Sequence, residues 1–124
     1  MSQPTVLFWG PGPDPWRKKL PAICAIQGLR LRSLFPADLD LPLARLAAGE
    51  SGTEGAVEPL PEPLLLFCHL NSIQLDRLLP ALRKAEVPQA CLKAVLTPHN
   101  AGWTLRALYE ELCKEREAMT GQGR

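Results

Sequence analysis

The stretch LLLFCHLNSIQLDRLL (residues 64–79) contains the most uniformly apolar run of the chain and, directly after it, the start of a helix. A short continuous apolar run such as Leu64–Cys68 is typical of a strand that is buried on both faces. Asn71 and Gln74 have the spacing of a capping box, in which each side chain bonds to the backbone N–H of the other residue. The stretch therefore predicts a central strand followed at once by a helix, which is the repeating unit of an α/β fold.

The same alternation of strand and helix recurs along the rest of the chain. Apolar runs predict strands at residues 5–9, 29–34, 64–68 and 91–96. Helical patterns begin at Pro15, near Leu41, after Asn71 and near Trp103, and glycines at 28 and 49 are placed to end the first two. This order favours parallel strands joined by right-handed crossovers. In residues 29–34 leucine alternates with Arg30 and Arg32, which indicates a half-exposed strand at the sheet edge.

The expected fold class is thus α/β, with a four-stranded, mostly parallel sheet in the order 2-1-3-4 flanked by helices. Such a sheet is flavodoxin-like, or a minimal doubly wound fold. A length of 124 residues predicts a single domain over residues 1–124. Residues 49–63 carry four Glu and no Lys or Arg, and are expected to form a flexible acidic loop. The C-terminal residues 119–124 are expected to fray.

Composition excludes several classes of function. The net charge of +1 gives no overall field that would attract nucleic acid or an anionic membrane. No stretch approaches the roughly 20 apolar residues that span a bilayer, and the N-terminus lacks the basic region of a signal peptide. The four cysteines never form a Cys-x-x-Cys pair, which argues against a zinc module or a thioredoxin-type redox site. A cytoplasmic protein with reduced thiols is the resulting expectation.

Three segments carry a family resemblance: LLLFCHL (64–70), LDRLLPALRKAEVP (75–88) and KAVLTPHNAGWTLRALYEELCKERE (93–117). Through them, residues 64–118 resemble a small family of bacterial proteins catalogued as domain of unknown function 3783, whereas residues 5–63 agree only in layout. The matching points are Lys93, Thr97, Asn100, Trp103 and Glu115. Pro80 departs from the uninterrupted helix of that family, and His69 stands where a small or hydroxyl residue is expected. The resemblance implies the fold and a bacterial cytosolic protein, and it implies no activity.

The candidate site is the carboxyl edge of the sheet, because ligands of open parallel sheets bind where the strands end. This edge is expected to bring together the only two histidines with aromatic and amide side chains from three loops. The expected ligand- or partner-binding residues are Trp9, His69, Asn71, Thr97, His99, Asn100 and Trp103. The leading hypothesis is a non-enzymatic binding or regulatory module for an unknown protein or small molecule.

The alternative hypothesis is a small metal- or thiol-dependent enzyme that uses Cys68, His69 and His99. These side chains are of the kinds that zinc accepts, and they supply a cysteine–histidine pair. However, Cys68 and His69 are adjacent, so their side chains tend to point to opposite sides of an extended chain. A buried strand cysteine is also far more often inert core. No catalytic residue, metal or cofactor is therefore assigned.

Two further motifs have structural explanations. WGPGPDPW (residues 9–16) is not a phosphate loop, because its prolines have no N–H to offer and Asp14 places a negative charge at the mouth. In residues 97–100, Pro98 holds Thr97 extended, and Asn100 is expected to bond the backbone of Gly102 or Trp103 as a cap. Thr104 is the alternative cap of the last helix. The segment is thus expected to set the last helix on the sheet, with a ligand role as the second possibility.

Overall fold

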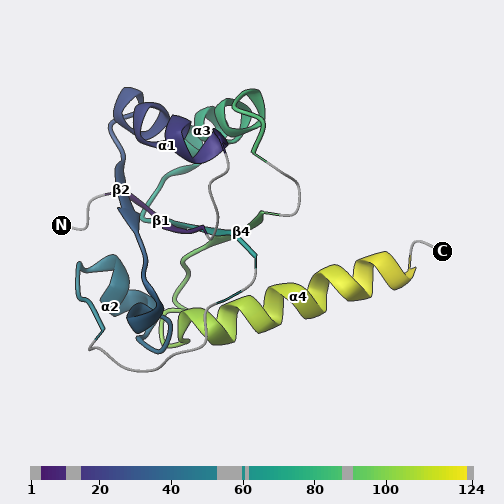
Figure 1. The fold of residues 1–124 in the computed structure, drawn as a ribbon. Helices are drawn as coiled ribbons and strands as arrows, with labels where there is room; N and C mark the ends of the chain where they lie inside the picture. Colours follow the sequence, from purple (N-terminus) through teal and green to yellow (C-terminus); the bar gives the residue numbers. More distant parts are fainter. Residues whose placement is uncertain (1–3, 11–14, 53–59, 61, 88–90, 123–124) are drawn as a thin grey trace.

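The computed structural model describes residues 4–10, 15–52, 60, 62–87 and 91–122, with the backbone alone at 15 and 117–122. The elements alternate along the chain (Figure 1). They are β1 (Thr5–Trp9), α1 (Pro15–Ile26), β2 (Arg30–Ser33), the 3₁₀ turn η1 (Pro36–Asp38), α2 (Leu43–Ala47), β3 (Leu64–Cys68), α3 (Ser72–Lys84), β4 (Leu92–Val95) and α4 (Leu105–Gln122). Each predicted strand is present, because continuous apolar runs are stable where both faces of a sheet are covered.

The sheet has the predicted order β2-β1-β3-β4, with β2 at one edge and β4 at the other. β1 pairs with β2, and β3 with β4, in parallel, so the mostly parallel α/β sheet is confirmed. The expectation that all strands run in one direction is wrong at the centre, because β1 and β3 are antiparallel. In this register Thr5 lies opposite Cys68, and Trp9 lies opposite Leu64. The strands therefore end at two different edges of the sheet.

The connection between β2 and β3 explains this reversal. α2 brings the chain back to the edge where β1 and β2 begin, since Ala47 and Gly49 line a small cavity together with Thr5 and Arg30. The chain is at the opposite edge again at Leu60, whose carbonyl oxygen accepts a hydrogen bond from the Trp9 indole at 3.1 Å. A single crossover would have placed β3 parallel to β1. Because the chain has returned to the edge where β1 ends before β3 begins, β3 starts beside the end of β1.

Two helical layers cover the sheet, one on each face (Figure 1). Alternate residues of β1 and β3 point to opposite faces, as the period of a strand requires. The α1/α3 layer packs on one set: Val6, Phe8, Leu65 and Phe67. The α2/α4 layer packs on the other set: Leu7, Trp9, Leu64, Leu66 and Cys68. Both faces of the central pair are therefore buried.

The helix ends follow the capping rules that the sequence suggested. Asn71 and Gln74 form the predicted capping box, with both hydrogen bonds at 2.8 Å. Gly28 follows α1 with φ +70°, a left-handed conformation that favours glycine. The hydroxyl of Thr104 accepts from the N–H of Ala107 at 3.1 Å, so Thr104 caps α4. The expected cap of α1, Asp14, lies outside the described residues.

Two expectations for mobile segments fall partly outside the described residues. Of the acidic segment, residues 53–59 and 61 lie outside them, while Glu62 forms a two-bond ion pair with Arg116 of α4, with both bonds at 2.7 Å. At the C-terminus, residues 119–122 belong to α4 and 123–124 lie outside. Within the described part of the chain, no helix combines the length and the apolar character needed to cross a membrane.

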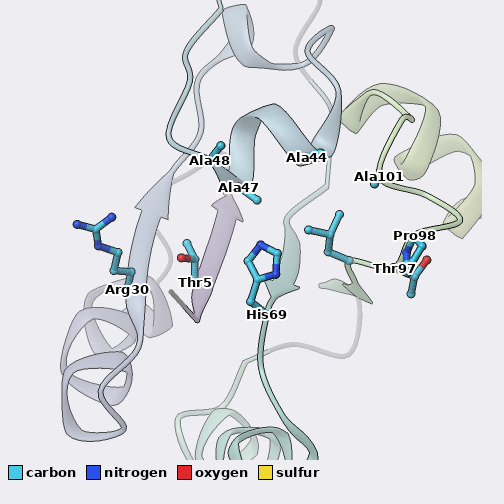
Figure 2. A pocket seen from close by; sticks show the side chains of 10 residues that line it. Thr5, Arg30, Ala44, Ala47, Ala48, His69, Thr97, Pro98 and Ala101 are labelled. Carbon is cyan, nitrogen blue, oxygen red and sulfur yellow. The ribbon is translucent and has the colours of Figure 1, made fainter. Parts of the chain in front are cut away.

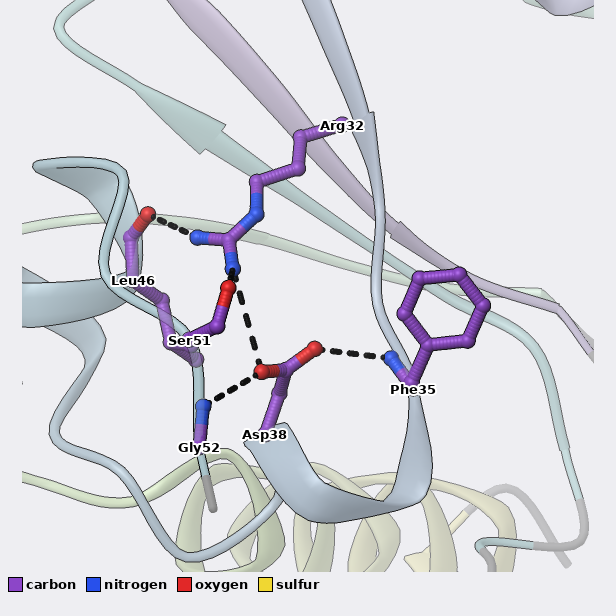
Figure 3. A network of polar contacts seen from close by, with 6 residues as sticks. All are labelled: Arg32, Phe35, Asp38, Leu46, Ser51 and Gly52. Atoms are coloured by element: carbon purple, nitrogen blue, oxygen red, sulfur yellow. Dashed lines mark hydrogen bonds and ion pairs between the residues drawn. The ribbon is translucent and has the colours of Figure 1, made fainter. Parts of the chain in front are cut away.

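A buried carboxylate joins β2, η1 and the segment after α2 (Figure 3). Asp38 is only 3% exposed, and its two oxygens accept from the N–H groups of Phe35 at 2.8 Å and Gly52 at 2.9 Å. Arg32 lies 3.7 Å from the same carboxylate and donates to the carbonyl oxygen of Leu46 at 2.6 Å. This network fixes the C-terminal end of α2 against the edge strand β2.

Candidate functional site

A cleft of about 830 Å³ opens at the sheet edge where β1 and β2 begin and β3 and β4 end (Figure 2). We call it the edge cleft. It lies between this edge and α2, and the loop after β4 closes one end. Its lining residues are Thr5, Arg30, Ala44, Ala47, Ala48, His69, Leu96, Thr97, Pro98 and Ala101. The volume lies within the roughly 300–1,000 Å³ of small-molecule sites.

His69 stands in the middle of the edge cleft (Figure 2). It follows β3 directly and has φ +61°, a left-handed conformation that is uncommon for a residue with a side chain. Figure 2 shows its ring directed toward α2. No residue that the structure describes hydrogen-bonds the imidazole, so its ring nitrogens are available to a ligand. Residues held in sparsely populated conformations cluster at ligand-binding sites.

The loop after β4 is held rigid by reciprocal hydrogen bonds. The side-chain oxygen of Asn100 accepts from the N–H of Thr97 at 2.8 Å, and the Thr97 hydroxyl accepts from the N–H of Asn100 at 3.2 Å. The amide group of Asn100 donates to the carbonyl oxygen of Val95 at 3.0 Å. Asn100 thus bonds backward to the strand, and the expected bond from its side chain to Gly102 or Trp103 is wrong.

The same loop also caps α2. The N–H groups of Leu43 and Ala44 donate to the carbonyl oxygens of Trp103 at 2.7 Å and Ala101 at 3.0 Å. A helix leaves its first N–H groups without internal partners, and here the loop supplies them. Hydrogen bonds therefore join α2, which forms one wall of the edge cleft, to the loop after β4, which closes its end.

The structure places the predicted site residues in different surroundings. His69 and Thr97 line the edge cleft. Asn71 caps α3, and His99 packs edge-on against Trp103, with ring centroids 5.3 Å apart. Asn100 is buried and bonds the loop, as described above.

The expectation that Trp9 shares this edge is wrong. Because β1 is antiparallel to β3, Trp9 lies beside the start of β3, and His69 follows its end. His69 is five residues along the chain from Leu64, the partner of Trp9, which is about 17 Å at about 3.3 Å per residue. Trp9 is buried and its indole is bonded to Leu60, which is a structural role.

The alternative set of Cys68, His69 and His99 does not form one centre. Cys68 points into the α2/α4 layer, and burial raises the pKa of its thiol to about 12. The nucleophilic form of cysteine is the thiolate, which this burial disfavours. His99 packs edge-on against Trp103 and is not among the residues that line the edge cleft. Among the described residues, no group of three or more His, Cys, Asp or Glu side chains is arranged to hold a metal ion.

Sequence reasoning missed the strand-start side of the edge cleft. Arg30 and Thr5 pair across β1 and β2, and both lie at the beginnings of strands, where a parallel sheet carries no site. The alternation of Arg30 and Arg32 was a usable signal, since it places both guanidinium groups on the face that α2 covers. The alanines of the segment LARLAAG (43–49) were a second usable signal. Their small side chains leave space on the cleft side of α2, whereas Leu43 and Leu46 fill the core on its other side.

Comparison with known proteins finds a family model that matches part of the chain. Residues 63–119 match the family model described as a domain of unknown function, DUF3783, which confirms the resemblance in the sequence. No curated protein and no solved structure matches the chain. The matched residues include His69, Thr97 and Ala101, and the match begins just before β3, so Arg30 and α2 lie outside it.

Proposed function

We propose that this chain, whose residues 63–119 belong to the DUF3783 family, is a non-enzymatic binding module with its ligand site in the edge cleft. The observation that carries the proposal is His69, which stands in the cleft without a hydrogen-bond partner from the described residues. The positive φ angle costs about 1–2 kcal/mol for a residue with a side chain. Ligand binding through the imidazole explains why a backbone conformation with this energetic cost is retained.

The surroundings support a preformed site. The loop after β4 is bonded to itself and to α2, so the cleft keeps its shape without a ligand. Preformed clefts with a few convergent polar groups are typical of small-molecule sites. We further propose that the chain acts as a single domain in a bacterial cytoplasm. The four cysteines are free thiols in the structure, which fits a reducing compartment.

The proposal predicts where small molecules bind. Protein labelled with ¹³C at alanine methyl groups is titrated with a fragment library of mixed charge, and methyl shifts are followed by NMR. Shifts are expected at Ala44, Ala47 and Ala101 in the cleft, and not at Ala22 of α1 or Ala81 of α3. Fragments that shift the α1 or α3 methyls instead, or no methyl at all, would contradict the proposal.

A matched pair of glycine variants separates binding from stability. His69→Gly removes the imidazole and also relieves the left-handed backbone, so the fold does not suffer. The fragments that bind the cleft are expected to lose about fivefold in affinity, as one lost hydrogen bond of about 1 kcal/mol implies. Glu86→Gly is the control, because Glu86 has φ +64° at the end of α3 and does not line the cleft. Equal affinities in both variants would remove His69 from the site.

A further inference from the structure

We infer that the ligand of the edge cleft is a small organic carboxylate with an apolar body, an inference that rests on the proposed function. Three features of the cleft carry it: the charges of its lining residues, the hydrogen bonds that already occupy the N–H groups of Leu43, Ala44, Thr97 and Asn100, and the alanine wall of α2. Each narrows the class of molecule that fits.

The lining residues favour an anion. Arg30 lies on the α2 face of β2, at the outer end of the cleft, where it is exposed, and Figure 2 shows its guanidinium directed outward, away from His69. No ion pair or hydrogen bond joins its guanidinium to any residue that the structure describes. Arg32, two residues on, is instead bonded to Leu46 and Ser51. Of the described residues that line the cleft, none is Asp or Glu, so a bound anion meets no repulsion there.

The backbone around the cleft argues for a carboxylate over a phosphate. Phosphate sites aim several backbone N–H groups at the ligand. Here the N–H groups of Leu43 and Ala44 are bonded to the loop after β4, and those of Thr97 and Asn100 are bonded within that loop. These four N–H groups are therefore not available to a phosphate. The planar guanidinium fork of Arg30 matches the two oxygens of a carboxylate and needs no cradle of backbone N–H groups.

The rest of the ligand faces methyl groups. Ala44, Ala47 and Ala48 form the α2 wall, with Leu96 and Ala101 across from it. These side chains offer apolar contact area, so this part of the cleft fits an aliphatic or aromatic body. The hydroxyl groups of Thr5 and Thr97 and the imidazole of His69 add polar groups beside it. A carboxylate near Arg30 would place the apolar body against the alanines.

A matched pair of probes tests the charge of the ligand. The dissociation constants of 3-phenylpropionate and its uncharged analogue 3-phenylpropionamide are measured by the alanine-methyl titration. The carboxylate is expected to bind at least about tenfold more tightly, as a charged hydrogen bond implies. Arg30→Gln should remove this preference, so that the carboxylate and the amide bind with similar affinities through the apolar contacts that stay in place.

A second variant pair tests the same point from the α2 wall. Ala44→Glu places a negative charge in the cleft, and Ala44→Gln places a neutral side chain of the same shape there. Ala44 is exposed in the first turn of α2, so both variants retain the fold. The glutamate variant is expected to bind 3-phenylpropionate at least about tenfold more weakly than the glutamine variant does, because like charges repel in the cleft. The amide should bind both variants equally.

The outcomes separate this inference from the proposed function. If the carboxylate and the amide shift the cleft methyls with equal affinity, or if the preference survives Arg30→Gln, the anionic class is wrong and the cleft remains a ligand site. If neither probe nor any fragment of the library shifts the cleft methyls, both the inference and the proposed function are wrong.

Discussion

Replacing Asp38 with alanine is expected to lower the free energy of unfolding by about 2–4 kcal/mol, one of the largest losses for a polar residue of this chain. The substitution leaves the N–H groups of Phe35 and Gly52 without their acceptor and removes the partner of Arg32. Buried donors without partners cost more than an exposed ion pair contributes. Urea denaturation followed by circular dichroism measures the loss.

Asp40 provides the matched control for Asp38. It lies two residues further on and pairs with Arg106 at 3.5 Å, but its side chain is 63% exposed. Asp40→Ala is therefore expected to change stability by less than about 1 kcal/mol, the usual range for surface pairs. Equal losses in the two variants would show that the Asp38 network does not hold α2 against β2.

Cys68 is expected to resist alkylation in the folded protein. With the pKa of its thiol raised to about 12 by burial, about one molecule in 10⁴ carries the thiolate at pH 8. Burial also raises the pKa of Cys91, to about 11, and that of Cys24. Cys113 of α4 is only half-buried, so it is expected to react with iodoacetamide at least about 100-fold faster than Cys68.

Peptide mass spectrometry after timed labelling reads the four rates separately. In guanidinium chloride all four cysteines should react alike, because the shift at Cys68 depends on the folded core. A folded protein whose Cys68 is labelled as fast as Cys113 would revive the thiol-dependent enzyme as the better hypothesis. Slow labelling of Cys68 supports its role as part of the α2/α4 core.

The strands and their order were predictable because burial is recorded directly in the residue pattern. Leu64–Cys68 is apolar throughout and forms a central strand, whereas the Leu/Arg alternation around Arg30–Ser33 marks an edge strand. The residue pattern does not show the direction of a strand, because an alternating pattern is the same when it is read in either direction. The reversal at β3 depends on the connection between β2 and β3. Its described part contains the 3₁₀ turn η1 and the short helix α2, and residues 50–63 have no periodicity in the sequence.

The candidate site was predictable only where the expected strand directions hold. β3 and β4 are parallel, so the loops after them lie at one edge and bring His69 and Thr97 into one cleft. Trp9 was placed there on the assumption that β1 runs parallel to β3. Because β1 is reversed relative to β3, the start of β1 and its neighbour β2 supply Thr5 and Arg30 in its place. The cleft thus combines strand starts with strand ends.

A crystal structure of the protein with 3-phenylpropionate bound tests both the strand directions and the binding site. We expect Thr5 beside Cys68 across the central pair, the carboxylate within hydrogen-bonding distance of Arg30, and the phenyl ring against Ala44 and Ala47. A central pair that runs parallel, or a probe seated at the opposite edge beside Trp9, would contradict this expectation.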